Sequence, residues 1–256
     1  MRFPSRFSLA LALAAAALVG CGGASPTTSS GSPDATSVGS PSPSEPSGSP
    51  TTSPTASPSA TPDLPPSLPP SYAGDVPSAE VPPSALVPAG ADVTGTWYGT
   101  TTEGEAIVVT WVVPGSDPFR LPHGLAVWRR FAGDGAPWRP VYGETWPKRA
   151  GVLSVSAFTA DVTGDGSDDA LVFALTGGSG ACGAYSVIDL LGAARVFDRR
   201  VCDTTIEPAT PTGLRVHEAV FEPDDPHCCP SAFRETVLAY RGPDDWSVVS
   251  ETETPT

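Results

Sequence analysis

The feature that most constrains the fold is an abrupt change of composition near residue 92. Between Gly22 and Ala91, 17 of 70 residues are Pro, 17 are Ser and 7 are Thr, and no Lys or Arg occurs between Phe7 and Phe119. Such a segment has too few bulky apolar side chains to offset the conformational entropy lost on ordering it. We therefore expect residues 21–91 to be a disordered, semi-extended linker. Residues 92–256 are then about 165 residues of foldable chain, enough for one hydrophobic core.

The residues before the linker have the features of an export signal. Arg2 and Arg6 precede eleven apolar residues, Leu9 to Val19. Eleven helical residues span about 17 Å, too short for a hydrocarbon core of about 30 Å. This predicts a signal peptide over residues 1–20 rather than a transmembrane helix.

The end of this signal carries a motif. Leu18-Val19-Gly20-Cys21 resembles a bacterial lipobox, and the resemblance implies cleavage before Cys21 and a diacylglycerol on its sulfur. The mature chain would then be held by lipid at the extracellular face of the cytoplasmic membrane, without spanning it. The alternative is an ordinary secretory signal in which the cysteine occurs by chance.

The expected domain is strongly acidic. Residues 92–256 contain 12 basic and 23 acidic side chains, a net charge of −11 out of −14 for the chain. Nucleic-acid binding requires clustered Lys and Arg to neutralise phosphates, so this balance argues against a nucleic-acid partner. It suits an extracellular domain, including one that binds cations.

The domain reads as a series of short β-strands separated by turn residues, and no segment keeps a 3.6-residue apolar period over three turns. We expect an all-β fold, a single antiparallel domain built as a sandwich or as a partial, propeller-like meander. The one candidate helix is Asp189 to Phe197. The expected strands are 96–102, 106–113, 125–131, 138–142, 152–159, 170–176, 185–191, 214–221, 233–240 and 246–250.

An acidic loop carries the sharpest chemical signal in the domain. It reads Asp-Val-Thr-Gly-Asp-Gly-Ser-Asp-Asp from residue 161 to residue 169. Calcium takes six to eight hard oxygen ligands, and Gly166 permits the sharp turn that would wrap the chain around an ion. The predicted ligands are side-chain oxygens at positions 1, 3, 5 and 9 and the backbone carbonyl at position 7, which are Asp161, Thr163, Asp165, Asp169 and Ser167.

The loop is not that of a helix-loop-helix calcium site, because Val172 stands where a bidentate Glu is needed and the flanks are strand-like. It resembles the D-x-[NT]-G-D-G-x-x-D loop of FG-GAP/VCBS-type β repeats, which join two strands around calcium. That resemblance implies a structural calcium ion. The alternative is a solvated acidic turn without metal.

Four cysteines remain once Cys21 is assigned to lipid: Cys182, Cys202, Cys228 and Cys229. An even number outside the membrane predicts two disulfides with three possible connectivities. We favour Cys182–Cys202 with a vicinal Cys228–Cys229 bridge, and the competing arrangement crosses the two pairs. A redox pair and a zinc site involving His227 are alternatives for the adjacent cysteines, although both lack the usual spacing.

The segment Asp225-Pro-His-Cys-Cys-Pro230 also carries a resemblance. Together with the acidic loop, it resembles secreted lipoproteins of high-GC Gram-positive bacteria, including the LppP/LprE type, over roughly residues 152–250. The resemblance implies an extracellular location and a β-rich fold, and no settled activity.

The sequence indicates classes of function rather than one specific activity. Five of the six tryptophans lie between Trp97 and Trp146 and would form either a ligand platform or, as we favour, core. The first hypothesis is a lipid-anchored module that binds a cell-wall polymer or a protein partner, and the second is a structural module of the envelope. The alternative is a hydrolase of wall polymers using two carboxylates, although no pair is singled out and no nucleophile or cofactor motif occurs.

Overall fold

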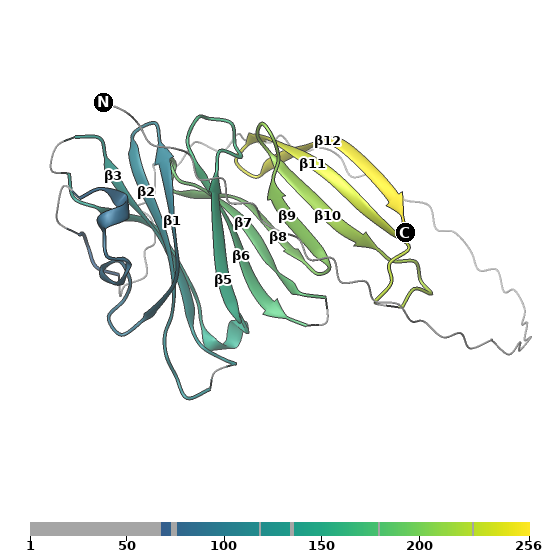
Figure 1. The fold of residues 1–256 in the computed structure, drawn as a ribbon, viewed down its shortest axis with the longest axis horizontal. Coiled ribbons are helices and arrows are strands. Elements are labelled where there is room, and N and C mark those ends of the chain that lie inside the picture. Colours follow the sequence, from purple (N-terminus) through teal and green to yellow (C-terminus); the bar gives the residue numbers. More distant parts are fainter. Residues whose placement is uncertain (1–67, 73–75, 118, 134–135, 179, 227) are drawn as a thin grey trace, which may run out of the picture. The chain divides into compact units, whose positions relative to one another are not determined.

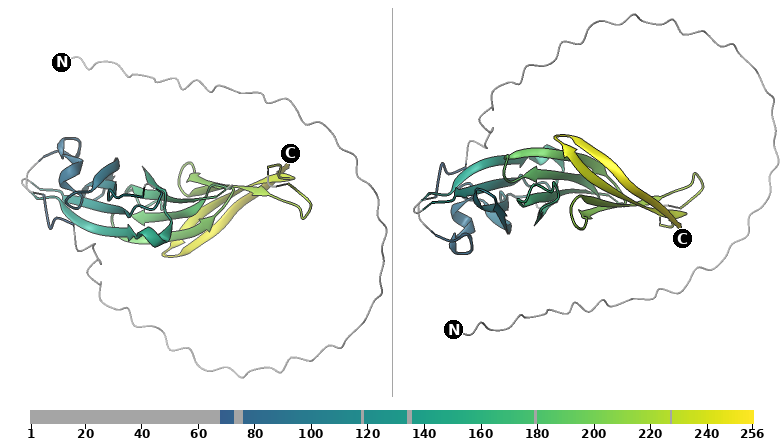
Figure 2. Two further views of the ribbon diagram at one scale, coloured as in Figure 1. Left: turned by 90° about the horizontal axis from the view of Figure 1, so that it is seen from below. Right: turned by 90° about the horizontal axis from the view of Figure 1, so that it is seen from above.

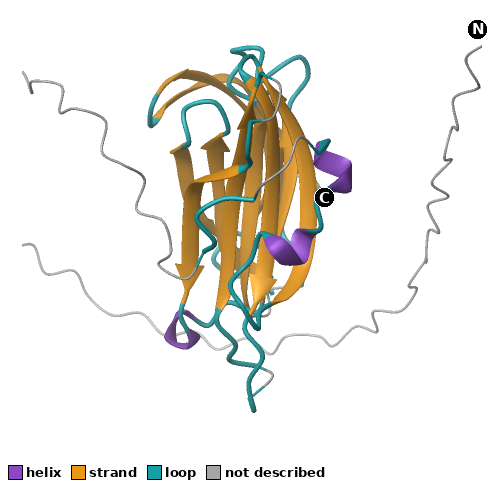
Figure 3. Cartoon of the chain, turned by 90° about the vertical axis from the view of Figure 1, so that its left-hand side faces the viewer, coloured by secondary structure: helices purple, strands orange, loops and turns teal. Residues whose placement is uncertain are grey.

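The computed structural model describes residues 68–72, 76–117, 119–133, 136–178, 180–226 and 228–256, all within one compact unit of the chain. The expected signal peptide, the expected lipidation site Cys21 and the linker up to residue 67 lie outside them. Strands dominate the described part, which has three short 3-10 turns and no α-helix (Figure 3). No helix there is long and apolar enough to cross a membrane.

Twelve strands form three four-stranded antiparallel sheets, and each sheet is a meander of consecutive strands (Figure 1). This confirms the expected antiparallel all-β fold. Sheet 1 comprises β1 (Asp92–Thr101), β2 (Gly104–Val112), β3 (His123–Phe131) and β4 (Arg139–Trp146). Sheet 2 comprises β5 (Ser154–Ala160), β6 (Asp169–Gly177), β7 (Cys182–Asp189) and β8 (Ala194–Val201). Sheet 3 comprises β9 (Thr204–Pro208), β10 (Leu214–Val220), β11 (Ala232–Gly242) and β12 (Asp245–Pro255).

The sheets pack face to face in chain order, as successive blades of a propeller do. Alternate residues of a strand point to opposite faces, so a central sheet must be apolar on both. On β6, Val172 packs against sheet 1 while Leu171 packs against sheet 3. On β7, Ile188 and Val187 divide in the same way. Sheet 2 is therefore the central layer, which explains why β6 and β7 read as nearly continuous apolar runs.

Strand β10 of sheet 3 shows the alternation of a strand with one buried face. On β10, Leu214 and Val216 are buried against sheet 2. The residues between and after them, Arg215 and His217, are partly exposed and lie within 3.7 Å of Glu235. Exposed pairs of this kind contribute little to stability. These ion pairs on the outer face therefore add little to the stability of sheet 3.

The outer face of sheet 1 is covered by residues from the expected linker. This N-terminal strap (residues 68–72 and 76–91) includes two 3-10 turns, η1 (Ser78–Glu80) and η2 (Pro83–Ala85), and appears in blue beside sheet 1 in Figure 2. Its Leu86 is fully buried, and the Leu86 carbonyl accepts a hydrogen bond from Trp128 Nε1 at 3.0 Å. The folded part therefore starts closer to the N-terminus than Asp92, the start expected from composition.

The expectation of a helix over Asp189 to Phe197 is wrong. Those residues form the end of β7, a tight turn and the start of β8. The Asp189 carboxylate accepts hydrogen bonds from the N–H groups of Leu191 and Gly192, at 2.7 and 2.8 Å. An Asp that binds the backbone two and three residues ahead favours a turn over a helix. The weak apolar pattern there is the buried face of two strands.

Candidate functional site

The acidic loop joins β5 to β6 and is folded around its own carboxylates. Asp161 accepts hydrogen bonds from the N–H of Gly164 at 2.6 Å and of Gly166 at 3.1 Å. Both glycines have positive φ, 80° and 84°, a backbone conformation that favours glycine. Asp165 accepts a hydrogen bond from the Ser167 N–H at 2.8 Å. The loop is thus a compact turn rather than an open acidic segment.

Asp169 is the buried member of the loop. Its side chain is fully buried, and Oδ2 accepts hydrogen bonds from the N–H groups of Val162 and Thr163, both at 2.9 Å. Burial raises the pKa of Asp169 to about 7, although Thr163 and Val162 act in the opposite direction. Asp169 Oδ1 and Thr163 Oγ1 are buried and make no hydrogen bond of regular geometry, although the Thr163 side chain lies close enough to Asp169 to lower the pKa of that carboxyl. Two hard oxygens inside the loop are therefore unsatisfied, which is costly and is relieved by a bound cation or water.

The loop is hydrogen-bonded to both neighbouring sheets. The Asp168 carboxylate accepts hydrogen bonds from the N–H and hydroxyl of Thr100 on β1, at 2.7 and 3.0 Å. Ser167 Oγ accepts one from the Thr102 N–H at 3.1 Å. On the other side, the Val162 carbonyl accepts one from the Gly213 N–H, next to β10, at 2.9 Å. The loop, which belongs to sheet 2, is accordingly hydrogen-bonded to sheet 1 and to the turn that precedes β10 of sheet 3.

The predicted ligands are only partly brought together. Among the described residues, no group of three or more His, Cys, Asp or Glu side chains is placed to hold a metal ion. The unsatisfied oxygens instead belong to Thr163 and Asp169, while Asp161 and Asp165 point to backbone N–H groups. A carboxylate oxygen accepts more than one interaction, so these hydrogen bonds leave further lone pairs for a cation. Oxygen atoms of this kind are the ligands that a hard cation takes.

The contacts that anchor the loop to β1 have no signature in the sequence. Asp168 is part of the motif, but its partner Thr100 lies 68 residues away on another sheet. Thr102 is 65 residues from its partner Ser167. No local pattern indicates either threonine, because both occur in an ordinary strand and turn. The two threonines reach the loop only because β1 packs against β5, and that packing becomes visible only in the folded structure.

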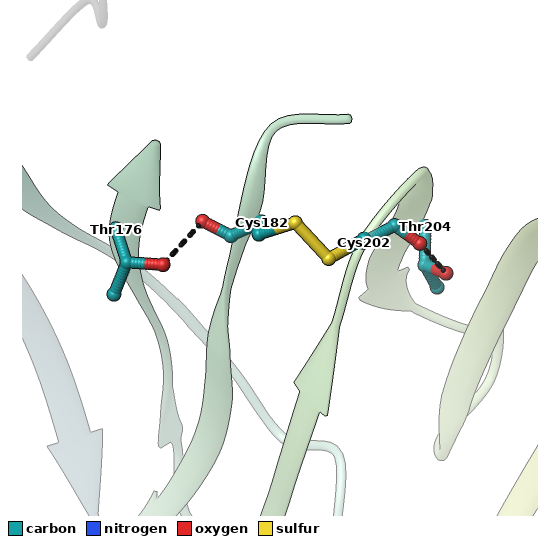
Figure 4. The surroundings of a disulfide bond; sticks show 4 residues. All are labelled: Thr176, Cys182, Cys202 and Thr204. Carbon is teal, nitrogen blue, oxygen red and sulfur yellow. Dashed lines mark hydrogen bonds between the residues drawn. A yellow bond between two sulfur atoms is a disulfide. The ribbon is translucent and has the colours of Figure 1, made fainter. Parts of the chain in front are cut away.

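The first disulfide confirms the favoured pairing. Cys182 at the start of β7 is bonded to Cys202, just after β8, at a sequence separation of 20 (Figure 4). The Thr176 hydroxyl donates a hydrogen bond to the Cys182 carbonyl, and the Thr204 hydroxyl to the Cys202 carbonyl, both at 2.9 Å. With these two cysteines joined, the crossed connectivity is excluded.

Cys228 and Cys229 lie on the loop between β10 and β11. Both are exposed, and their sulfurs are 2.9 Å apart with no S–S bond between them. His227, the third residue of the zinc alternative, lies outside the described residues. The vicinal disulfide expected from the sequence stays a prediction.

The tryptophans are core residues rather than a ligand platform. Trp111, Trp128 and Trp138 are at most 1% exposed, and Trp97 and Trp146 are partly buried against the core between sheets 1 and 2. Two of the surface cavities measure about 530 Å³ and 220 Å³. The larger one, between β5 and β9, has a single carboxylate, Glu207, and the smaller one has none. Neither offers the carboxylate pair that the hydrolase alternative requires.

Comparison with known proteins gives no family: no family model, curated protein or solved structure matches the chain.

Proposed function

We propose that the chain is a lipid-anchored module of the cell envelope whose three-sheet domain is held in shape by calcium in the acidic loop. The observation that carries the calcium part of this proposal is the pair of buried oxygens, Asp169 Oδ1 and Thr163 Oγ1, in a loop that is hydrogen-bonded to both neighbouring sheets. The anchor is Cys21, and the location is the extracellular face of the cytoplasmic membrane. The Cys182–Cys202 disulfide supports that location, because such bonds persist in oxidising compartments.

The calcium ligands of this proposal are Asp161, Thr163, Asp165 and Asp169 through their side chains and Ser167 through its carbonyl. Calcium supplies positive charge and accepts hard oxygen ligands in flexible geometry. Its role here is structural. Neutralising Asp169 in a buried site and ordering the loop both stabilise the contacts to Thr100, Thr102 and Gly213. The proposed partner of the domain is a wall polymer or another envelope protein. The net charge of −11 over residues 92–256 argues against nucleic acid.

Calcium is expected to raise the melting temperature of the purified chain relative to chelator. A ligand at 100 times its Kd stabilises by about 2.7 kcal/mol, which corresponds to a shift of roughly 5–10 °C for a domain of this size. Asp165→Asn keeps an oxygen for the Ser167 N–H but removes a charged ligand, so its calcium response should shrink. Asp245→Asn, exposed at the start of β12, is the matched control and should respond as the unmodified chain does. The same melting temperature with millimolar calcium and with chelator would remove the calcium part of the proposal.

Replacing Cys21 by Ala is expected to move the chain from the membrane fraction to the soluble or secreted fraction. One lipidated residue is the proposed link to the bilayer, and without it only the exported chain remains. Cys228→Ala, which leaves Cys21 in place, is the control and should stay with membranes. The measurement is fractionation followed by extraction into detergent. A Cys21→Ala chain that remains in the membrane fraction would contradict the lipid anchor while leaving the calcium result intact.

A further inference from the structure

The loop between β10 and β11 carries two adjacent cysteine thiols at the surface. Cys228 and Cys229 are both exposed, and their sulfurs are only 2.9 Å apart. The other two cysteines of the described domain are joined to each other, so they do not compete for these sulfurs. The two thiols therefore can react with each other, and with reagents in the solvent, without any rearrangement of the sheets.

The loop is closed by Asp225 independently of its cysteines. One oxygen of that carboxylate accepts hydrogen bonds from the Glu222 N–H at 2.8 Å, the Ser231 N–H at 2.9 Å and the Ser231 hydroxyl at 2.7 Å. These bonds, that from the Ser231 side chain foremost, lower the pKa of Asp225. The loop thus keeps its ends together at neutral pH whether or not the sulfurs are bonded.

A bond between adjacent cysteines adds almost nothing to fold stability. In the chain-entropy account, a disulfide stabilises by closing a loop in the unfolded chain, and the effect grows with loop length. Cys182–Cys202 spans 20 residues, whereas Cys228 and Cys229 are consecutive and close no loop of chain. A bond that is both exposed and confined to a strained small ring is also the more readily reduced one. The Cys182–Cys202 bond is therefore suited to stabilising the fold, and the Cys228–Cys229 pair to thiol–disulfide exchange.

We propose that Cys228 and Cys229 form a thiol–disulfide exchange site that is oxidised and reduced reversibly by disulfides and thiols outside the membrane. This goes beyond the proposed envelope module and depends neither on calcium nor on the anchor.

The exchange has two steps. One thiolate of the pair attacks a sulfur of a disulfide co-reactant, RS–SR, which forms a mixed disulfide and releases one RS⁻. The neighbouring thiolate attacks the sulfur of the pair that carries the RS group, so that the Cys228–Cys229 bond forms and the second RS⁻ leaves. The pair loses two electrons and two protons. The co-reactant gains both as two RSH molecules.

The experiment is a redox titration of the purified full chain with glutathione mixtures and with dithiothreitol, followed by trapping of thiols with N-ethylmaleimide and digestion with trypsin. Cleavage after Arg215 and Arg234 yields one peptide that contains Cys228, Cys229 and no other cysteine. Cys182 and Cys202 fall in two further peptides, because Arg195, Arg199 and Arg200 lie between them. Each pair is therefore followed separately in the same sample.

We expect the peptide of residues 216–234 to change reversibly between two trapped thiols and none. Its midpoint should require at least roughly 100-fold less reducing conditions than that of Cys182–Cys202. Its oxidation should leave the melting temperature within about 2 °C, since no loop of chain is closed. Cys229→Ser should accumulate a glutathione adduct on Cys228, because the second thiol that releases glutathione is gone. The unmodified chain should not accumulate it.

Several outcomes would overturn the exchange site. Both pairs could titrate at one midpoint, the peptide of residues 216–234 could stay reduced in excess oxidised glutathione, or the unmodified chain could carry stable glutathione adducts. The first result would remove the proposed difference between the two pairs, the second would show that the first attack does not occur, and the third that the neighbouring sulfur does not complete the second step.

Discussion

Replacing Leu86 by Ala is expected to lower the free energy of unfolding by about 2–5 kcal/mol. Leu86 is fully buried in the cluster that covers the outer face of sheet 1, with Trp128 and Trp138 among its members. Truncation removes buried apolar surface and leaves a cavity. The side chains on the strands of sheet 1 can fill that cavity only in part, because the sheet fixes their positions. The effect is large although composition places Leu86 in a linker.

The matched control is Ser84→Ala, two residues earlier on η2 and exposed. Its unfolding free energy should stay within about 0.5 kcal/mol of the unmodified chain. Urea unfolding of both variants, followed by tryptophan fluorescence, gives the comparison, because Trp128 Nε1 is hydrogen-bonded to the Leu86 carbonyl. If Leu86→Ala were as stable as Ser84→Ala, the strap would not be packed and the folded part would begin at Asp92.

The strap shows where composition fails as a predictor. Averaged over 70 residues, Pro, Ser and Thr dominate, and the average hides three apolar residues, Val81, Leu86 and Val87, that are almost fully buried. They follow neither a period of 2 nor one of 3.6, because the segment consists of 3-10 turns and extended chain. A segment whose order depends on the sheet it covers has no local signature.

Strands with an alternating or continuous apolar pattern were predictable, and the exceptions have a physical reason. All ten expected strands coincide at least in part with observed ones, but β8 and β9 were not expected as strands. β8 reads Ala-Arg-Val-Phe-Asp-Arg-Arg-Val, in which Val196 and Phe197 are consecutive buried residues. β9 has only Ile206 fully buried among five residues. Their pairing with β7 and β10 decides their structure, and the sequence of each alone does not.

The acidic loop was predictable as a turn and only in part as a site. The spacing of Asp161, Asp165 and the two glycines determines the local hydrogen bonds, which are all within six residues. Which carboxylate is buried is a different matter. Asp169 is buried because it begins β6 in the central sheet, and the sequence does not say which strand is central.

Replacing Asp169 by Ala is expected to destabilise the domain by about 2–6 kcal/mol even in chelator. The substitution leaves the N–H groups of Val162 and Thr163 without their acceptor, and each unsatisfied buried group costs about 1–3 kcal/mol. Asp169→Asn retains an acceptor oxygen for those N–H groups, and its amide can donate to the lone pairs of the Thr163 hydroxyl beside it. In chelator, Asp169→Asn should therefore lie within about 1 kcal/mol of the unmodified chain.

The same two variants separate the backbone role of Asp169 from its proposed calcium role. Urea unfolding with chelator and with millimolar calcium should show that Asp169→Asn keeps its stability but loses the calcium-dependent gain, because a neutral amide is a weaker calcium ligand than a carboxylate. The control is Asp245→Asn, exposed on β12, which should keep both. An Asp169→Asn variant that gains as much from calcium as the control would place the ion elsewhere. A variant as unstable as Asp169→Ala in chelator would show that the carboxylate charge itself, rather than an acceptor oxygen, holds the turn where the three sheets connect.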